Sequence, residues 1–235
     1  MKHLTYLLLL LVLFSCKEEE PTVPSENETG SLALSINSQF NDADFSLNQV
    51  YILNDTLSIR VEGIKFYLSD VCANSVKADG LSLYELDGDY IFDVNTGNYS
   101  SLSFNLGLDS ITNHGDPSLY VSSHPLSSFN DTHWSWAQGY KFILIDGKFD
   151  SDGDHVPDQS FSYHIGNDDY LKLVQLNTSF SITENQTSHV DLLFNVAKIF
   201  DGIDIANNTF THSTGQFDLV NQLANNCQSA FTIDE

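Results

Sequence analysis

Short runs in which apolar and polar residues alternate constrain the fold of this chain more than any other feature. Leu32, Leu34 and Ile36 alternate with polar residues, as in a strand that buries one face. Gly63 interrupts a longer run of this kind, which predicts a bulge or a break at that point. Further alternating runs, separated by clusters of Gly, Asn, Asp and Ser, occupy residues 48–53, 57–68, 81–86, 90–94, 101–106, 140–149, 161–165 and 171–182.

This series of short strands and tight turns predicts an all-β chain folded as an antiparallel β-sandwich. Residues 190–200 and residues 216–227 instead show mixed or helical periodicity, so one or two short helices are expected near the C-terminus. Residues 108–132 form the longest stretch without a periodic pattern. A loop of that length in a compact domain usually has a functional role.

Residues 1–15 resemble the signal peptide of a bacterial lipoprotein. Lys2 precedes an apolar run, residues 4–14, that is too short to span a bilayer comfortably. Ser15 then precedes Cys16, as the small residue of a lipobox precedes the cysteine that becomes lipidated. An ordinary signal peptide or a single N-terminal anchor helix is the alternative. Lipidation of Cys16 predicts a protein that is anchored to a membrane rather than spanning it.

Residues 16–30 are charged and contain proline, with no apolar periodicity, and are predicted to be a flexible acidic tether. Residues 18–20, all glutamate, look like a signal that sends lipoproteins to the cell surface in some Gram-negative bacteria. We therefore expect an extracytoplasmic protein that is lipid-anchored at the outer membrane. Residues 31–235 are long enough for one ordinary domain with a substantial core.

The chain is strongly acidic, with a formal net charge of −23 at pH 7. Such a surface disfavours binding to nucleic acid and to anionic lipid headgroups, because both of these partners are themselves negative. It is compatible with cations as partners, and equally with a role in solubility alone.

Two cysteines, Cys72 and Cys227, remain once Cys16 is assigned to lipidation. In an oxidising compartment they are candidates for a disulfide. A bridge that closes so long a loop would stabilise the fold by about 4–5 kcal/mol on the chain-entropy model. Two separately buried thiols are the alternative.

An acidic run between two predicted strands resembles a calcium-binding loop. Asp150, Asp152, Asp154 and Asp158 occupy positions 1, 3, 5 and 9 of this loop, a spacing that directs several oxygens at one hard cation. Position 6, which normally takes glycine for a sharp turn, is His155, and no glutamate occupies position 12. Histidine tolerates positive φ better than a branched residue does. The alternative is a solvated acidic hairpin without an ion.

His164 is the histidine whose orientation strand periodicity predicts most clearly. Phe161, Tyr163 and Ile165 share the apolar face of the predicted strand, so Ser162 and His164 point to the opposite face. Imidazole is the commonest ligand for copper and zinc. A lone histidine at such a position is nevertheless more often structural or exposed to solvent.

Further imidazole and indole rings lie at two other places in the sequence. His133 adjoins Trp134, with Trp136 two residues further on, and His212 precedes the last predicted helix. Core packing explains the two tryptophans equally well.

The sequence contains no HExxH, CxxC, Gly-x-Ser-x-Gly, Walker or dinucleotide motif, and no nucleophile paired with a base. A binding protein is therefore expected rather than an enzyme.

Three segments are similar to the MbnP-like copper-binding protein family. Residues 134–142, WSWAQGYKF, match the family's Trp-x-Trp-x-x-Gly-Tyr-Lys-Phe segment, and residues 161–166, FSYHIG, match its Tyr-His-Leu/Ile-Gly strand. Residues 64–70, IKFYLSD, look like the family's N-terminal strand signature. Together the likeness covers most of the chain from residue 31 onward.

The resemblance implies a secreted β-sandwich that binds a copper ion through histidines. In characterised relatives a tryptophan beside the metal is oxidised to kynurenine. Carried over by motif, His164 is the strongest ligand candidate and His212 a weaker second one, while Trp134 or Trp136 would be the modified ring. His133 departs from the apolar residue that is usual at its position, and is either an extra ligand or an accident.

Two functions are consistent with these patterns. The leading hypothesis is capture or handling of a metal, with copper as the metal, by a lipid-anchored protein outside the cytoplasm. The alternative is a cell-surface interaction module that binds a glycan or a protein partner. In that case Trp134 and Trp136 would form an exposed platform, and the acidic loop would be a structural calcium site.

Overall fold

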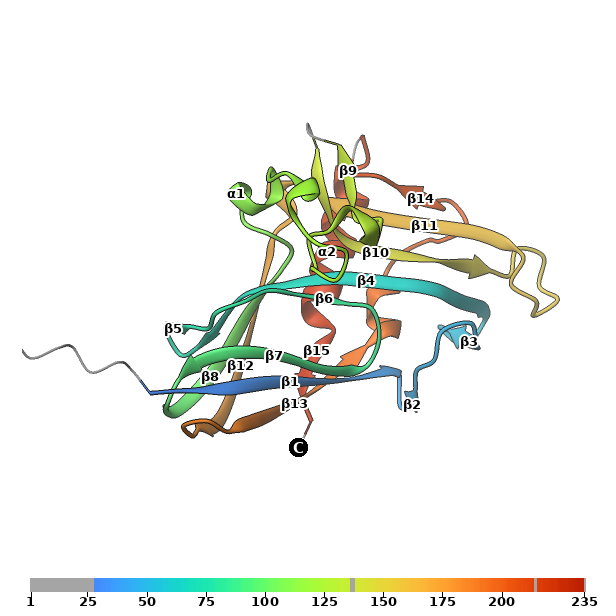
Figure 1. The fold of residues 1–235 in the computed structure, drawn as a ribbon. Helices are drawn as coiled ribbons and strands as arrows, with labels where there is room; N and C mark the ends of the chain where they lie inside the picture. The colour runs from blue at the N-terminus through green and yellow to red at the C-terminus, as the bar shows by residue number, and fades with distance from the viewer. Residues whose placement is uncertain (1–27, 136–137, 214, 235) are drawn as a thin grey trace, which may run out of the picture.

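Two β-sheets lie face to face in the computed structural model, which describes residues 28–135, 138–213 and 215–234 (Figure 1). This arrangement confirms the predicted β-sandwich. The smaller sheet has the strand order β15-β13-β1-β2, with β7 also paired to β1. Its strands are β1 (Thr29–Phe40), β2 (Ala43–Asp44), β7 (Gly88–Asn95), β13 (Thr187–Asn195) and β15 (Phe231–Ile233).

The larger sheet has the order β12-β8-β4-β10-β11-β14 and is centred on the long strand β4. Strands β3, β5 and β6 pair with β4, and β9 pairs with β10. The strands of this sheet are β3 (Val50–Leu53), β4 (Leu57–Ala73), β5 (Val76–Lys77), β6 (Ser82–Tyr84), β8 (Gly97–Leu106), β9 (His133–Ser135), β10 (Gly139–Phe149), β11 (Gln159–Gly166), β12 (Lys172–Ile182) and β14 (Phe210–Thr211).

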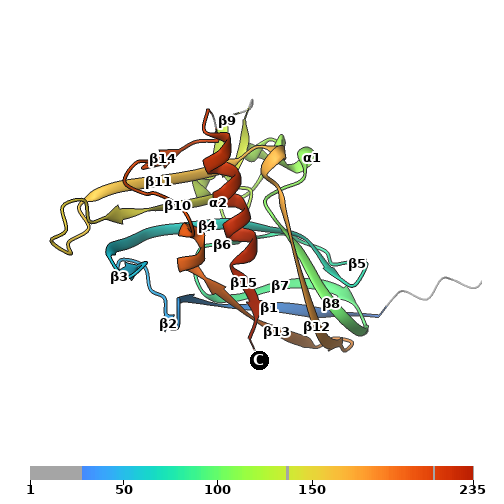
Figure 2. The ribbon, with the colours of Figure 1, turned by 180° about the vertical axis from the view of Figure 1, so that it is seen from behind.

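Within the described residues, helical structure is confined to short pieces and one C-terminal helix. Helix α2 crosses beside the edges of both sheets and contacts β12 and β15, as the view from behind shows (Figure 2). The predicted helix at residues 216–227 is therefore confirmed. The helical elements are α1 (Ser110–Asn113), α2 (Phe217–Ser229) and the 3-10 helices η1 (Pro117–Leu119), η2 (Ser128–Asn130), η3 (Asp168–Tyr170) and η4 (Val196–Phe200).

The prediction of a helix over residues 190–200 is wrong for its first half. Val190, Leu192 and Phe194 are buried and alternate with less buried residues, which is the period of a strand, and they belong to β13. Only η4 at the end of that segment is helical. The pairings β1–β13 and β11–β14 are parallel, so the sandwich is mixed rather than purely antiparallel.

Aromatic rings join the two sheets in the core. Phe66 of β4 stacks on Tyr84 with ring centroids 4.1 Å apart, and meets Phe194 of β13 edge-on at 5.1 Å. Phe194 in turn stacks on Phe231 of β15 at 4.7 Å. Such rings bury a large apolar area and also favour offset or edge-on geometry. This cluster therefore holds the two sheets together at their centre.

The predicted irregularity near Gly63 is present as a β-bulge. Asp146 pairs with Gly63, whereas the next residue of β10, Gly147, pairs with Val61, so one residue of β4 is left between the two pairs. The bulge changes the course of β4 beside the strand that carries Asp146.

The predicted disulfide is wrong, because Cys72 and Cys227 are both free thiols. Cys72 is near the end of β4, opposite Lys77 of β5, and its Sγ donates to the carbonyl oxygen of Asp70 at 3.4 Å. Cys227 is in the buried face of α2, and burial raises the pKa of its thiol to about 12. The two cysteines are thus the separately placed thiols of the alternative interpretation.

No helix within residues 28–135, 138–213 and 215–234 combines the length and apolar character needed to cross a bilayer. The predicted signal peptide, Cys16 and most of the tether lie outside the described residues, so those assignments stay predictions. Strand β1 already begins at Thr29, so the last two residues of the predicted tether belong to the strand.

Candidate metal centre

His164 lies on the outer face of the larger sheet, as strand periodicity predicted. Phe161, Tyr163 and Ile165 of β11 are buried in the core, and the side chain of His164, on the opposite face, is 15% exposed. The imidazole is therefore sheltered without being sealed from solvent.

His212 reaches the same place through the short parallel strand β14. Ser162 pairs with Phe210 and Tyr163 with Thr211, so the next residues along the two strands, His164 and His212, are neighbours. The side chain of Ser213 then ties the segment to β11, since its Oγ accepts from the Gly166 amide at 2.8 Å and donates to the His164 carbonyl at 3.1 Å. The pairing of two segments almost fifty residues apart in sequence thus brings the two imidazoles together.

The two imidazole rings are stacked, with centroids 5.0 Å apart and an angle of 5° between their planes. Ring nitrogens direct their lone pairs in the plane of the ring, so an ion shared by both rings would lie at their edges. We name His164 and His212 the imidazole pair.

Trp134 of β9 completes an aromatic wall beside the imidazole pair. Its indole centroid is 6.2 Å from that of His212, and the ring of Phe210 approaches His212 edge-on at 5.8 Å. The indole lies over Gly166, where an added Cβ would be only 2.6 Å from Cζ3 of Trp134. Glycine at 166 is therefore needed for the close approach of the indole to β11. The other predicted ring, Trp136, lies outside the described residues.

Asp146 and Ser162 also contact the imidazole pair, and sequence reasoning did not find Asp146. Nε2 of His164 is 3.1 Å and 3.3 Å from the two carboxylate oxygens of Asp146, and 3.2 Å from Oγ of Ser162. Asp146 of β10 is the register partner of Ser162, two residues from His164 on the same face. Strand alternation alone places Asp146 on an outer face, but only the β10–β11 register reveals its partner.

The surroundings of His212 favour its neutral, metal-competent ring. Burial, together with His164 and Lys141, lowers the pKa of His212, although Asp146 opposes this effect. Burial raises the pKa of Asp146, but hydrogen bonds from His164 and Ser162 outweigh it, so the net pKa is lowered. A neutral imidazole is the form that binds metal.

His133 is directed away from the imidazole pair. It adjoins Trp134 in β9, and successive strand residues point to opposite faces. Its ring packs edge-on against Tyr140 at 4.9 Å, and burial lowers its pKa. Its role as an additional copper ligand stays a prediction.

The acidic loop brings three of its four predicted ligands together. Asp150, Asp152 and Asp154 each offer a carboxylate oxygen, and these oxygens lie within 4.8 Å of one another. In the part of the chain that the structure describes, no other group of three His, Cys, Asp or Glu residues is as close. Asp158 stands apart from this group and accepts a hydrogen bond from Oγ of Ser151 at 3.0 Å.

The carboxylate of Asp150 is already engaged by the backbone of its own loop. It accepts hydrogen bonds from the amides of Gly153 at 2.8 Å and His155 at 2.7 Å. His155 has φ +67°, which is the left-handed conformation expected where the loop would otherwise carry glycine. The left-handed turn at His155 thus takes the form that the loop spacing predicted, and calcium binding stays a prediction.

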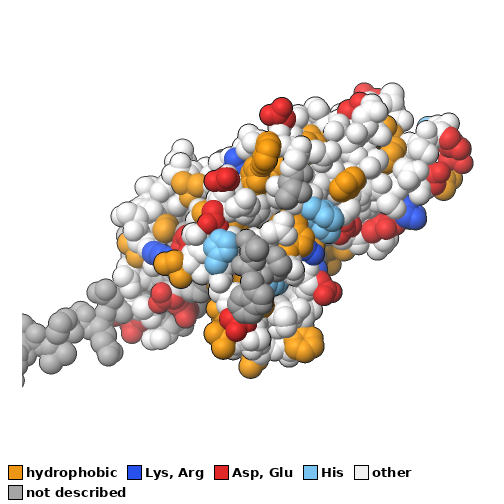
Figure 3. All heavy atoms as spheres, turned by 90° about the horizontal axis from the view of Figure 1, so that it is seen from above, with side chains coloured by type: hydrophobic (Ala, Val, Ile, Leu, Met, Phe, Trp, Pro, Cys, Tyr) orange, Lys and Arg blue, Asp and Glu red, His pale blue; other side chains and the backbone are white. Residues whose placement is uncertain are grey.

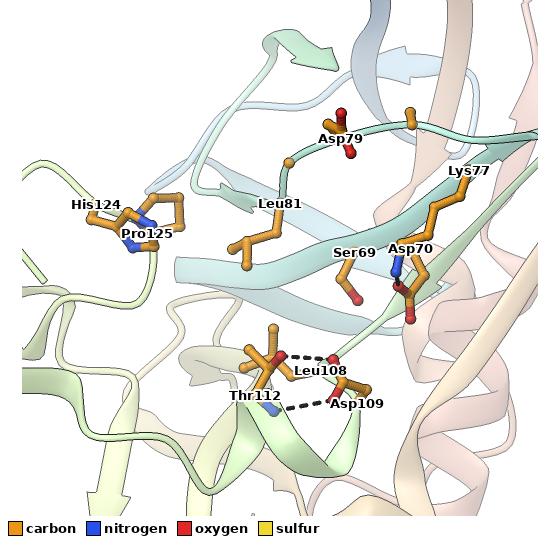
Figure 4. A pocket seen from close by; sticks show the side chains of 12 residues that line it. Ser69, Asp70, Lys77, Asp79, Leu81, Leu108, Asp109, Thr112, His124 and Pro125 are labelled. Atoms are coloured by element: carbon orange, nitrogen blue, oxygen red, sulfur yellow. Dashed lines mark hydrogen bonds and ion pairs between the residues drawn. The ribbon is translucent and has the colours of Figure 1, made fainter. Parts of the chain in front are cut away.

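A surface cavity of about 470 Å³ lies elsewhere, between the end of β4, β5, α1 and the loop at His124 (Figure 4). Three of its charged groups have partners: Lys77 pairs with Asp70, and Asp109 caps α1 by accepting from the amide and hydroxyl of Thr112. None of the residues predicted to bind metal lines this cavity.

One serine, histidine and aspartate cluster also occurs on the smaller sheet. Oγ of Ser35 is 2.7 Å from Asp89 and 2.9 Å from Nδ1 of His189. The carboxylate of Asp89 is on the same side of the ring as the serine, 3.8 Å from the same Nδ1. A catalytic triad requires the carboxylate to hold the opposite ring nitrogen, so this cluster lacks the geometry of an activated nucleophile.

Comparisons with known proteins agree with this architecture. The family model described as MbnP matches residues 29–216 of the chain. Among solved structures the chain is similar to MbnP from Methylosinus trichosporium, with 12% sequence identity and a TM-score of 0.52, over 76% of this chain and 80% of that chain. At that identity the likeness concerns the fold. The search of curated proteins found no match.

Proposed function

The chain belongs to the MbnP family, and from this premise we propose that it captures or handles copper, with His164 and His212 as ligands beside Trp134. The observation that carries the proposal is the imidazole pair, whose ring centroids are 5.0 Å apart on the outer face of the larger sheet. The pair comes from segments far apart in sequence and contains the His164 of the Tyr-His-Ile-Gly strand that resembles the family.

The donor set at this place suits copper better than a hard cation. Imidazole nitrogens are good ligands for copper, whereas calcium and magnesium prefer several oxygens. Asp146 contacts His164, but the described residues contain no group of three His, Cys, Asp or Glu ligand atoms, all within 4.8 Å of one another, that includes both imidazoles. Copper(I) accepts as few as two ligands, so the two imidazoles are sufficient. The ring of Trp134 would then lie beside the ion. Bound copper would supply a redox-active ion, which the protein's residues hold and orient.

Titration of copper(I) against a chromophoric copper(I) chelator tests this proposal. We expect one high-affinity ion per chain, and a loss of at least about 100-fold in affinity for His164→Ala and for His212→Ala, since removing even an outer partner of a metal ligand typically costs about 10–100-fold. His189→Ala is the matched control, because His189 is an exposed histidine on the smaller sheet.

Unchanged affinity in His164→Ala would remove this residue from the site. An equal loss in His189→Ala would show that copper binds to surface imidazoles without a defined centre. Circular dichroism of each variant establishes that the sandwich is intact.

The proposed setting is outside the cytoplasm, with the chain attached to the outer membrane through lipidated Cys16. The role proposed is binding rather than catalysis. The lipobox-like sequence before Cys16 supports the attachment to the membrane. The arrangement of Ser35, Asp89 and His189, which does not match a catalytic triad, supports a binding role. Mass spectrometry of the protein isolated from membranes measures the acyl chains directly, and the same spectra report any oxidised tryptophan in residues 134–136.

A second candidate function is binding of a protein or glycan partner at the same end of the molecule. Seen from above, this end displays hydrophobic and histidine side chains among acidic ones (Figure 3). Four apolar side chains of the long loop are exposed by 72–89%: Ile111, Leu119, Val121 and Phe129. A partner that bound here would change tryptophan fluorescence in the absence of any metal, and the change would be lost in Phe129→Ser.

A further inference from the structure

We propose that Asp146 is a positioning residue that holds His164 as the Nε2–H tautomer and thereby makes Nδ1 the atom that ligates the metal. The inference deepens the proposed function and rests on it for the identity of the ligand. It assigns a role to a side chain that no sequence motif marked, and it specifies which nitrogen of His164 faces the ion.

The distances define the direction of the hydrogen bond. Oδ1 and Oδ2 of Asp146 are 3.1 Å and 3.3 Å from Nε2 of His164. An ionised carboxylate only accepts hydrogen bonds, so the proton between the two residues must reside on Nε2. A neutral imidazole carries a single ring proton, which leaves the lone pair on Nδ1.

The carboxylate of Asp146 is the acceptor in this contact. An aspartate has an ordinary pKa of about 3.9, so it is ionised at the pH of about 8 used in the experiment below. With Asp146 ionised, the alternative tautomer would set an unprotonated Nε2 against a carboxylate, with no proton between them. That tautomer is therefore disfavoured.

The backbone fixes the arrangement from both sides. Asp146 and Ser162 are register partners in β10 and β11, and His164 follows two residues later on the same face. The backbone carbonyl oxygen of His164 also accepts a hydrogen bond from the hydroxyl of Ser213, the residue next to His212. The hydrogen bond to Asp146 restrains the ring of His164 about its side-chain torsion, which keeps it parallel to the ring of His212. Carboxylates that hold the distal nitrogen of a metal-binding histidine act in this way.

A competing arrangement would make Asp146 itself a ligand. The short distance between Nε2 and the carboxylate would then reflect two groups converging on one ion, and the ring proton would lie on Nδ1. Copper's preference for nitrogen over carboxylate oxygen argues against this arrangement. The two arrangements differ in the copper(I)-loaded protein, where the first would keep the proton on Nε2 and the second would remove it; the metal-free tautomer tests whether Asp146 holds Nε2–H at all.

Long-range proton–nitrogen NMR of the metal-free, 15N-labelled protein reads the tautomer of each histidine. The spectrum is recorded at about pH 8, where ordinary imidazoles are neutral, and the His164 signals are assigned by their loss in His164→Ala. We expect the Nε2–H pattern for His164 in the wild type, loss of this preference in Asp146→Ala, and its recovery in Asp146→Glu. Copper(I) affinity should fall about 10–100-fold in Asp146→Ala.

Asp89→Ala is the matched control, because it removes a carboxylate beside His189 on the smaller sheet and should leave the His164 pattern unchanged. An Nδ1–H pattern in the wild type overturns the proposal, as does a His164 pattern that is insensitive to Asp146→Ala in the folded protein. Failure of the proposed function is separate: it would appear as unchanged copper affinity in His164→Ala, whatever tautomer the metal-free protein shows.

Discussion

The imidazole pair and the acidic loop are two candidate metal centres with opposite origins. Trp134, His164 and His212 come from three segments and meet only because β9, β11 and β14 belong to one sheet. Asp150 and Asp154, by contrast, lie in one loop of consecutive residues. The imidazole pair thus depends on long-range strand pairing, whereas the acidic loop depends on the local geometry of its own turn.

The same contrast applies to what stabilises each centre. The imidazole pair relies on the β11–β14 register and on the two hydrogen bonds of Ser213. The loop relies on amides of its own backbone, which donate to Asp150. A disturbance of the sheet should therefore damage the first centre and spare the second.

Gly166→Ala should have the largest effect on stability and copper affinity, and it should disturb the imidazole pair while leaving the acidic loop intact. An added Cβ would lie 2.5 Å from the carbonyl oxygen of Tyr140 and 2.6 Å from the indole of Trp134, so the indole must move away from β11. We expect a loss of about 1–3 kcal/mol in the free energy of unfolding and a fall in copper affinity. Urea denaturation and chelator competition measure the two quantities.

Gly63→Ala is the control, because no atom lies within 4 Å of an added Cβ there. Its unfolding free energy should change by no more than about 0.5 kcal/mol. Equal effects of the two substitutions would contradict the close fit of Trp134 over Gly166.

Calcium should stabilise the protein through the acidic loop, with an intermediate effect. At calcium concentrations about 10–100 times Kd, linkage predicts about 1.4–2.7 kcal/mol of added stability. The increase in Tm should vanish in the double variant Asp152→Asn and Asp154→Asn, which removes charge from the clustered oxygens and keeps their size.

Copper affinity in that double variant should equal that of the wild type, since the two centres share no ligand. A calcium response that persists without both carboxylates would place the calcium site elsewhere.

Mild acid should produce the smallest effect and separate the two centres by pH. Burial lowers the pKa of His133 and of His212 below the ordinary 6.5, so the unfolded chain binds more protons than the folded one. Stability should therefore decline as the pH falls from about 6.5 through the lowered pKa values of these histidines. Urea denaturation at about pH 7.5 and about pH 5.5 measures the decline, which should be shallower in His212→Gln.

The acidic loop should respond only at lower pH. Burial opposes ionisation of Asp150, but hydrogen bonds from Gly153 and His155 outweigh it and lower its pKa below 3.8, so its contribution is lost only in stronger acid. Identical pH dependence of wild type and His212→Gln above about pH 5 would show that the imidazole pair is not the sensitive group.

Several features were predictable from the sequence because they depend on local rules. Strand alternation placed His164 opposite the buried Tyr163, and the loop spacing anticipated the left-handed His155. The C-terminal helix followed from its periodicity. The segment around Leu192 was misjudged, since a short apolar run is ambiguous between helix and strand until its neighbours are known.

Strand order and register, in contrast, were decided by the tertiary structure alone. The stacking of His212 on His164, the hydrogen bond from His164 to Asp146, and the separation of Cys72 from Cys227 all depend on which strands are neighbours. Periodicity reports which face of a strand is buried, but it carries no information about the partner strand, which the packing of the whole core selects.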